Sequence, residues 1–230
     1  GALQNSWGEG LFDDSHNINV DREGFLWIGD RINHVIYKYT RDGQRLMTLG
    51  TPGVSGDDSS TTSFNRAAHV TTAPNGDIFV ADGYVNHRIV HFSSDGTFIN
   101  IIGGLAGTGT GQLDGVHGVQ VDSRGRLVVL DGHLENPRIQ IFSQDGEWLD
   151  EWENLGLVRG SGLAVDANDT VYIGDSDGEQ VIAVRDGVVV DRIAGIEARP
   201  HNITLDRETG DLYLADTGML GGRVKKIAKK

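Results

Sequence analysis

The stretch Asp77-Ile78-Phe79-Val80-Ala81-Asp82, a short apolar run that ends in aspartate, is the unit from which the fold of this chain can be read. Four more runs share this form and also end in aspartate, at residues 25–30, 126–131, 170–175 and 211–216. The closing aspartates follow one another at intervals of 52, 49, 44 and 41 residues. A sequence period of about 40–50 residues predicts a propeller blade of four strands for each repeat.

Each repeat is expected to hold a first strand before the closing-aspartate strand and two strands after it. Third strands are predicted at residues 35–39, 88–92, 138–142, 181–184 and 223–227, and Asp-Gly turns lead to the fourth strands. The last repeat has no Asp-Gly turn, so residues 2–7 are predicted to supply its fourth strand. The expected fold is one all-β propeller domain over residues 1–230, either five-bladed or derived from a six-bladed parent that lacks one blade.

Composition limits the partners. The formal net charge is −13 and the sequence pI is about 4.9, so the chain would repel phosphate backbones and nucleic acid is excluded as a partner. No run of 18 apolar residues is present, so no membrane span is predicted. The chain has no Cys, which excludes disulfides and thiolate metal sites but leaves the compartment open.

Three histidines occupy the same place in the repeat. His16, His117 and His201 open the first strands of repeats one, three and five, whereas Ala68 and Ser161 stand there in repeats two and four. The repeat itself therefore does not require histidine. Three imidazoles that converge would make a metal site of the zinc-enzyme type, with one coordination position open for substrate. The alternative is local hydrogen bonding by each histidine within its blade.

Two segments resemble a known family. Asn86-His87-Arg88-Ile89 resembles the signature of NHL-repeat propellers, and the longer segment from Val80 to Ser93 is similar to a blade of peptidyl-α-hydroxyglycine α-amidating lyase. The resemblance implies an NHL-type propeller in which His16, His117 and His201 bind catalytic zinc. It also implies that Tyr84 is a general base, that Arg138 is an active-site arginine, and that a structural calcium is held by the backbone oxygen of Ile18 and by residue Asn202.

Alternatives remain for two of these residues. Tyr84 could be a loop aromatic that packs between blades. Arg138 could be structural, because Arg88 and Arg223 recur at the same place in the third strand.

The chain also departs from the family pattern. The family has a further blade before the first histidine, which contributes another arginine, and this chain starts too late to contain it. Arg199 stands where the animal enzymes have methionine, Val85 replaces a disulfide cysteine, and Asn202 replaces an acidic calcium ligand.

The leading functional hypothesis is a zinc-dependent carbon–nitrogen lyase that releases glyoxylate and an amide from a peptide or small-molecule substrate. The alternative is a non-catalytic NHL propeller that binds a protein or peptide. A calcium-dependent lactonase-like propeller ranks last, because the first strands offer His, Ala, His, Ser and His rather than carboxylates. A monomer is expected, and the resemblance favours a secreted or periplasmic location with the cytoplasm left open.

Overall fold

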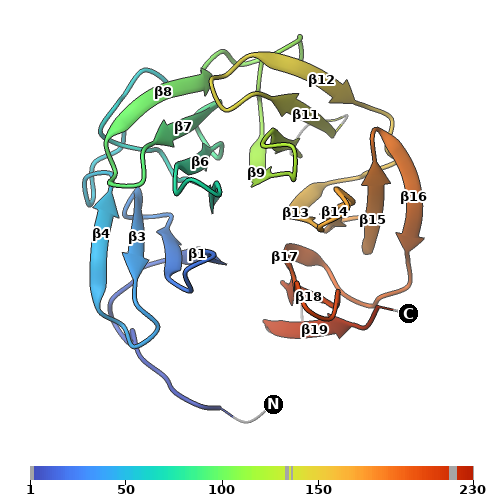
Figure 1. Ribbon diagram of the computed structural model, residues 1–230, viewed down its shortest axis with the longest axis horizontal. Helices are drawn as coiled ribbons and strands as arrows, with labels where there is room; N and C mark the ends of the chain where they lie inside the picture. Colours follow the sequence, from blue (N-terminus) through green and yellow to red (C-terminus); the bar gives the residue numbers. More distant parts are fainter. Residues whose placement is uncertain (1–2, 133–134, 136, 218–221, 230) are drawn as a thin grey trace. The chain divides into compact units, whose positions relative to one another are not determined.

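The computed structural model describes residues 3–132, 135, 137–217 and 222–229, and all regular elements in them are β-strands (Figure 1). Within these residues, 19 strands form five antiparallel sheets with the strands of each sheet in chain order. The five repeats are therefore five blades, and the expected all-β propeller class is confirmed. None of the described residues belongs to a helix that is long and apolar enough to cross a membrane.

The chain divides into two compact units, Gly1–Gly104 and Leu105–Lys230. The single domain expected over residues 1–230 stays a prediction. The first unit holds two four-stranded sheets, β1-β2-β3-β4 and β5-β6-β7-β8. Their strands are β1 Ser15–Val20, β2 Leu26–Asp30, β3 Val35–Tyr39, β4 Arg45–Leu49, β5 His69–Thr72, β6 Ile78–Asp82, β7 Arg88–Phe92 and β8 Phe98–Gly103.

The second unit holds two four-stranded sheets, β9-β10-β11-β12 and β13-β14-β15-β16, and the three-stranded sheet β17-β18-β19. The strands of the first sheet are β9 Val116–Val121, β10 Leu127–Asp131, β11 Arg138–Phe142 and β12 Trp148–Trp152. Those of the second are β13 Gly160–Val165, β14 Val171–Asp175, β15 Gln180–Arg185 and β16 Val188–Ile193. The third consists of β17 Pro200–Leu205, β18 Leu212–Asp216 and β19 Arg223–Ile227.

Neighbouring blades within a unit pack through their apolar faces. In the first unit, Trp27 and Ile36 of one blade share a buried cluster with Phe64, Val80 and Val90 of the next. Two further clusters join the blades of the second unit in the same way. Full burial of such a side chain contributes about 1.5–3 kcal/mol, so the alternating apolar positions of the strands are the main stabilising force.

The closing aspartates fix the segment that leads into each first strand. Asp30 accepts hydrogen bonds from the backbone amides of Asp13 and Asp14, at 3.0 and 3.2 Å, and Asp131 accepts them from Asp114 and Gly115, at 3.1 and 2.8 Å. The other three do the same: Asp82 with Asn65, Asp175 with Val158 and Arg159, and Asp216 with Arg199. All five carboxylates are almost completely buried. The closing aspartates thus cap the incoming segment of every blade.

The prediction of a fourth strand at residues 2–7 is wrong for those of its residues that the structure describes. Residues 3–8 form no strand, and Ala2 lies outside the described residues. Trp7 explains the difference: its ring lies 5.1 Å from that of Tyr39, and its Nε1 donates to the carbonyl of Arg41. The N-terminal segment is therefore fastened to the first blade by an aromatic contact rather than by a strand ladder.

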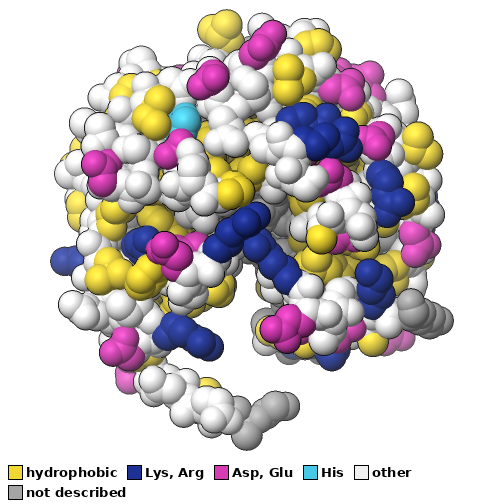
Figure 2. Space-filling model, viewed as in Figure 1, with side chains coloured by type: hydrophobic (Ala, Val, Ile, Leu, Met, Phe, Trp, Pro, Cys, Tyr) yellow, Lys and Arg dark blue, Asp and Glu magenta, His cyan; other side chains and the backbone are white. Residues whose placement is uncertain are grey.

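The surface agrees with the composition. Acidic, basic and apolar side chains are interspersed over the blades (Figure 2). Several of the exposed arginines are paired with carboxylates, as Arg124 is with Asp169 and Asp186. On the face shown in Figure 2, the acidic side chains are therefore scattered rather than gathered in one patch.

Candidate functional site

Each candidate zinc histidine stands on a β-bulge. In the first blade, Ser15 pairs with Asp30 and Asn17 with Gly29, so His16 is the extra residue between two ladder pairs. The same shift in register surrounds His117 in β9 and His201 in β17, and also Ser161 in β13. A bulge re-aims the side chain that it carries, and bulges are common beside active sites. The fold therefore gives the three histidines a common placement at the start of the first strand.

The ring of His16 is oriented by its own unit. Its Nδ1 lies 3.0 Å from the carbonyl oxygen of Ala68, just before β5. Because a carbonyl can only accept, Nδ1 carries the hydrogen and Nε2 keeps its lone pair. Burial lowers the pKa of His16, and the nearby charge of Arg31 lowers it further, against the opposing effects of the Ala68 carbonyl and Asp14. His16 is therefore a neutral imidazole near pH 7.

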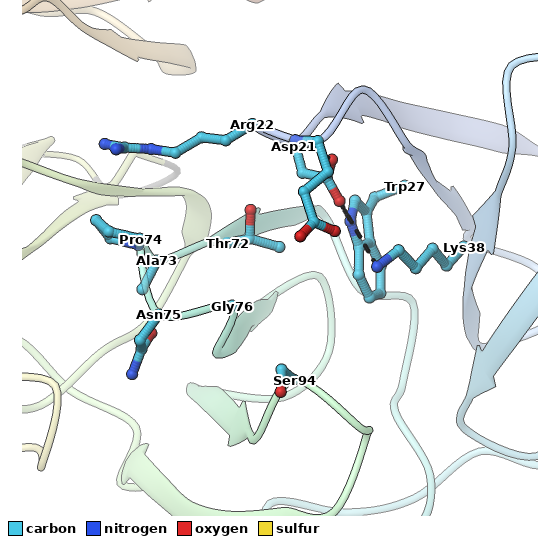
Figure 3. Close-up of a pocket in the computed structure, with 11 residues that line it drawn as sticks. Asp21, Arg22, Trp27, Lys38, Thr72, Ala73, Pro74, Asn75, Gly76 and Ser94 are labelled. Carbon is cyan, nitrogen blue, oxygen red and sulfur yellow. Dashed lines mark hydrogen bonds and ion pairs between the residues drawn. The ribbon is translucent and has the colours of Figure 1, made fainter.

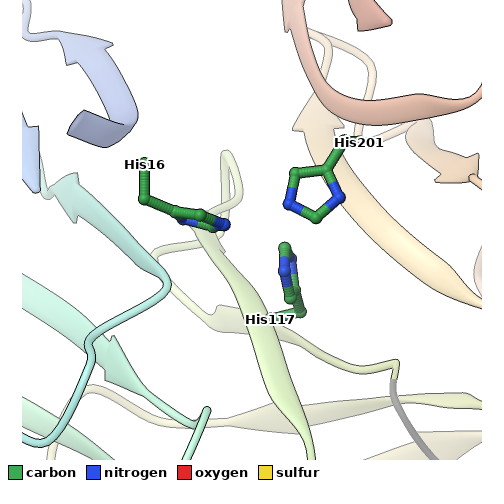
Figure 4. A group of neighbouring side chains, drawn as sticks. All are labelled: His16, His117 and His201. Carbon is green, nitrogen blue, oxygen red and sulfur yellow. The ribbon is translucent and has the colours of Figure 1, made fainter. Parts of the chain in front are cut away.

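His117 is oriented in the same way in the second unit. Its Nδ1 lies 2.6 Å from the carbonyl oxygen of Ser161, and the ring is buried. Its ring stands edge-on to that of His201, with 4.9 Å between centroids, and the potential ligand nitrogens of these two histidines lie within 4.8 Å of each other. Figure 4 draws these two side chains together with His16 of the first unit. The His117–His201 pair could hold a metal ion, given further ligands.

Tyr84 and His16, predicted from separate motifs, are in direct contact within the first unit. The Tyr84 hydroxyl lies 2.8 Å from His16 Nε2, and the two rings meet edge-on at 5.1 Å. Since Nε2 has the lone pair, the hydroxyl donates. A packing role between blades does not account for this polar contact. The general-base role of Tyr84 stays a prediction, but the residue does stand beside a candidate metal ligand.

Arg31 is a neighbour of this pair that sequence reasoning did not find. Its guanidinium carbon lies 5.0 Å from the centre of the Tyr84 ring. Its Nε and Nη2 both reach Asp14 Oδ2, at 2.7 and 2.6 Å. Burial would lower the pKa of Arg31, but Asp14, joined by Tyr84, outweighs it and raises the pKa. Arg31 is thus a permanent cation beside Tyr84.

Arg138 is engaged elsewhere. Its side chain is 2% exposed, its Nε bonds Asp131 at 3.3 Å, and its Nη1 bonds Glu151 at 2.9 Å. Further bonds reach loop carbonyls of Thr108, Gly109 and Gln112. Arg88 fastens the preceding loop in the same way through Asp58, Ser60, Ser63 and Asp82. These contacts support the structural alternative, and the active-site role of Arg138 stays a prediction.

The two expected calcium residues lie in different units. Ile18 is in β1 with its side chain exposed, and it pairs with Ile28. Asn202 is in β17, and its Oδ1 accepts a hydrogen bond from the backbone of Ile203 at 2.9 Å. The calcium site therefore stays a prediction.

Asn17 is a second residue that the sequence did not indicate. It follows His16, its side chain is buried, and neither its Oδ1 nor its Nδ2 has a hydrogen-bond partner among the described protein atoms. A buried amide without partners costs about 1–3 kcal/mol. Its pattern in the sequence is that of an ordinary strand residue, so no sequence signal could have revealed it.

A cavity of about 350 Å³ lies at the other end of the first two blades. It is lined by the turns that follow β1 and β5, with Asp21, Trp27, Lys38 and Asn75 among its residues (Figure 3). Lys38 and the Trp27 indole both interact with Asp21. His16 stands where β1 begins, whereas the cavity lies at the turn where β1 ends, so the cavity is separate from the contact between His16 and Tyr84.

Comparison with known proteins supports the sequence resemblance. Residues 64–92 match the NHL repeat family model. NHL repeat-containing protein 3 of Homo sapiens is 31% identical over 224 residues, which cover 85% of this chain and 61% of that protein. The probable peptidyl-α-hydroxyglycine α-amidating lyase of Caenorhabditis elegans is 37% identical over 94 residues, covering 40% of this chain and 26% of that protein.

Two comparisons set the scale of the likeness. Peptidylglycine α-amidating monooxygenase of Rattus norvegicus is 30% identical over 93% of this chain, which corresponds to 23% of that protein. A virginiamycin B lyase structure from Staphylococcus aureus has a TM-score of 0.64 at 17% identity, covering 92% of this chain and 68% of that one, and so shows the fold alone. The chain spans about three fifths of the length of NHL repeat-containing protein 3. The chain is therefore a β-propeller that matches the NHL repeat over residues 64–92 and is similar in sequence to NHL repeat-containing protein 3 and to the amidating lyases.

Proposed function

We propose that the chain is a zinc-dependent carbon–nitrogen lyase of the peptidyl-α-hydroxyglycine amidating type, with His16, His117 and His201 as the zinc ligands. The observation that carries the proposal is the 2.8 Å contact between the Tyr84 hydroxyl and His16 Nε2. It joins a potential proton acceptor to a candidate metal ligand. The similarity to amidating lyases supports the reaction type.

The donor set suits zinc. His16 and His117 each use Nδ1 for a backbone carbonyl, which presents Nε2 as a neutral ligand atom. His201 occupies the same bulge position in its blade. When bound, zinc would lower the pKa of a substrate hydroxyl toward neutrality. One lone pair cannot serve both a metal and a hydroxyl, so the Tyr84 hydroxyl must leave His16 Nε2 when a metal binds there.

The remaining chemistry can be assigned to Tyr84. Once it has lost its own proton, the Tyr84 phenolate oxygen would take the proton from the α-hydroxyl of the substrate, and the carbon–oxygen bond becomes a carbonyl as the carbon–nitrogen bond breaks. The electron pair leaves with the amide nitrogen, which takes a proton from Tyr84 or water. The products are glyoxylate and the amide, with no net oxidation. A well-placed acid–base group of this kind contributes about 10²- to 10⁴-fold in rate.

The test is release of glyoxylate from N-benzoyl-α-hydroxyglycine by zinc-loaded protein. Wild-type protein should release glyoxylate and benzamide in equal amounts, and His201→Ala should not. Ser123→Ala is a matched control, since Ser123 lies in the turn at the other end of the third blade and bonds Asp169. Zinc-loaded wild-type protein that releases no glyoxylate would rule the lyase proposal out.

The second candidate is a propeller that binds a protein or peptide without cleaving it. The similarity to NHL repeat-containing protein 3 favours it, because that relative covers 85% of this chain and its name gives no reaction. This candidate predicts that the His201→Ala variant still captures the partner. The lyase proposal predicts that the same change abolishes its function.

The expected calcium stays part of the proposal at Ile18 and Asn202. Calcium prefers oxygen ligands and more than two of them. Asn202 Oδ1 already accepts one hydrogen bond, so a calcium there has to replace it. Calcium content measured beside zinc in wild-type protein and Asn202→Ala tests this point.

A further inference from the structure

We propose that Arg31 binds a carboxylate of the substrate, and that Asp14 positions its guanidinium. The identity of the substrate rests on the proposed lyase function, whereas the binding of a carboxylate at Arg31 does not. The ligand class is a small molecule or peptide end that carries a carboxylate next to an acylated nitrogen.

The blades themselves show that Arg31 is not needed by the repeat. The residue after the closing aspartate donates its backbone amide to a carbonyl just before the first strand in four blades: Arg31 to Asp14, Gly132 to Gly115, Ser176 to Arg159 and Thr217 to Arg199. In the second blade the corresponding residue is Gly83. Arginine therefore stands only in the first blade at a place where the fold accepts Gly, Ser or Thr.

The ion pair between Arg31 and Asp14 also contributes too little to the stability of the fold to explain its presence. The side chains of Arg31 and Asp14 are 34% and 26% exposed. Surface pairs of this kind contribute about 0–1 kcal/mol. The same backbone link is made in three other blades by Gly, Ser or Thr, whose side chains cannot form an ion pair. A role in orienting the guanidinium remains.

The guanidinium of Arg31 is anchored to Asp14 and lies beside Tyr84. Both bonds to Asp14 end on a single oxygen, Oδ2, so Asp14 holds one edge of the planar guanidinium. The rest of the group lies beside the Tyr84 ring, whose hydroxyl contacts His16. A guanidinium with one edge anchored is well suited to bidentate recognition of a carboxylate. The bound carboxylate would then lie next to Tyr84.

The negative charge of the chain favours a local cation at any site for an anionic ligand. The chain carries a net charge of −13, which repels an anionic ligand at long range. Arg138, the arginine that the sequence resemblance assigned to the site, is 2% exposed and already bonded to Asp131, Glu151 and loop carbonyls. The side chain of Arg31 is partly exposed and lies beside Tyr84. The structure thus favours Arg31 as the carboxylate receptor.

The experiment compares N-benzoylglycine with its neutral carboxamide, neither of which can be cleaved by the proposed reaction. Binding to the full zinc-treated chain is measured by calorimetry in wild type, Arg31→Gln and Arg31→Lys. Arg124→Gln is the matched control, because Arg124 is an exposed, ion-paired arginine at the opposite end of a blade. Wild type and Arg124→Gln should bind the acid more tightly than the amide.

Arg31→Gln should weaken binding of the acid by about 10- to 100-fold and leave the amide nearly unchanged, as expected for the loss of a charge-assisted hydrogen bond. Arg31→Lys should give an intermediate loss, since it keeps the charge but not the fork. Equal weakening of acid and amide, or no preference for the acid in wild type, would overturn the inference.

The two proposals fail separately. If N-benzoyl-α-hydroxyglycine is not cleaved but acid binding depends on Arg31, the lyase function falls and the carboxylate site stands. If the substrate is cleaved and Arg31→Gln does not discriminate acid from amide, the lyase function stands and the carboxylate site falls.

Discussion

The first and third blades use the same bulge to place an imidazole but surround it with different residues. In both, the histidine Nδ1 faces the carbonyl of the residue at the equivalent place in the next blade, Ala68 for His16 and Ser161 for His117. The residue after the closing aspartate is Arg31 in the first blade and Gly132 in the third. The repeat thus fixes where the imidazole stands, and substitutions at neighbouring positions decide which groups it meets.

The closing aspartates differ in the same way. Asp131 is paired with the buried Arg138, whereas Asp30 receives its side-chain hydrogen bond from Asn33. The third blade therefore uses its arginine to hold a loop. The first blade holds Asp30 with a neutral amide and presents its arginine, Arg31, beside Tyr84. Arginine thus holds a loop in the third blade and lies beside Tyr84 in the first, and its position relative to the closing aspartate decides which.

The largest expected effect is on the free energy of unfolding, and it distinguishes the Asp131–Arg138 ion pair from the Asp30–Asn33 hydrogen bond. Arg138→Ala should lower the free energy of unfolding by about 3–5 kcal/mol, because it leaves Asp131 buried without its ionic partner. Asn33→Ala should cost only about 1 kcal/mol. Urea unfolding of both variants measures the contrast. Equal losses would mean that the two blades hold their aspartates with equal strength.

Replacing the hydroxyl beside His16 should affect rate rather than folding. Tyr84→Phe removes the proposed proton acceptor and is expected to lower kcat by about 10²- to 10⁴-fold. Zinc content should stay the same, because the zinc ligands are untouched. Kinetics with N-benzoyl-α-hydroxyglycine and metal analysis of one sample provide the test. A variant with full activity would show that Tyr84 only packs against the imidazole.

The pH dependence of stability should have opposite signs in the two blades. Burial alone would raise the pKa of Asp30, but hydrogen bonds from Asn33 and the amides of Asp13 and Asp14 outweigh it and lower the pKa. Burial raises the pKa of Asp131, against opposing bonds from Asp114, Arg138 and Gly115.

A lowered pKa means that the unfolded chain binds more protons, so the stabilisation from Asp30 is present above about pH 4 and is lost as pH falls through its folded pKa. The stability difference between wild type and Asp30→Asn should therefore rise with pH. The difference between wild type and Asp131→Asn should fall with pH. Urea unfolding from pH 3 to 7 gives both slopes, and slopes of one sign would contradict the contrast.

The smallest effect is expected from Ser161→Ala. The change removes the hydroxyl bond to Ser176 at 3.0 Å but keeps the carbonyl that orients His117. Stability should fall by less than about 1 kcal/mol, and zinc affinity should change by less than about twofold. Calorimetric zinc titration checks this. A large loss of affinity would show that the Ser161 side chain, not its carbonyl, holds the imidazole.

The sequence could predict the elements because strands leave a local pattern. The third strands β3, β7, β11 and β19 span the residues expected from alternation, and the histidine positions follow from the repeat. The residues around the site could not be predicted in this way. The Ala68 carbonyl is a backbone atom with no residue signature, and it meets His16 across 52 residues. Arg31 can be recognised as a site residue only from its distance to Tyr84. The predicted N-terminal strand is wrong because the contact of Trp7 with Tyr39 outweighs the strand pattern of that segment.

Metal content tests the central claim most directly. Wild-type chain, purified without chelator and offered zinc, should hold about one zinc ion, the count expected for a single three-histidine site. His117→Ala should lose it, and Ser161→Ala should keep it. No zinc in the wild-type chain, or zinc that remains in His117→Ala, would contradict the account and leave the histidines as part of the blade architecture.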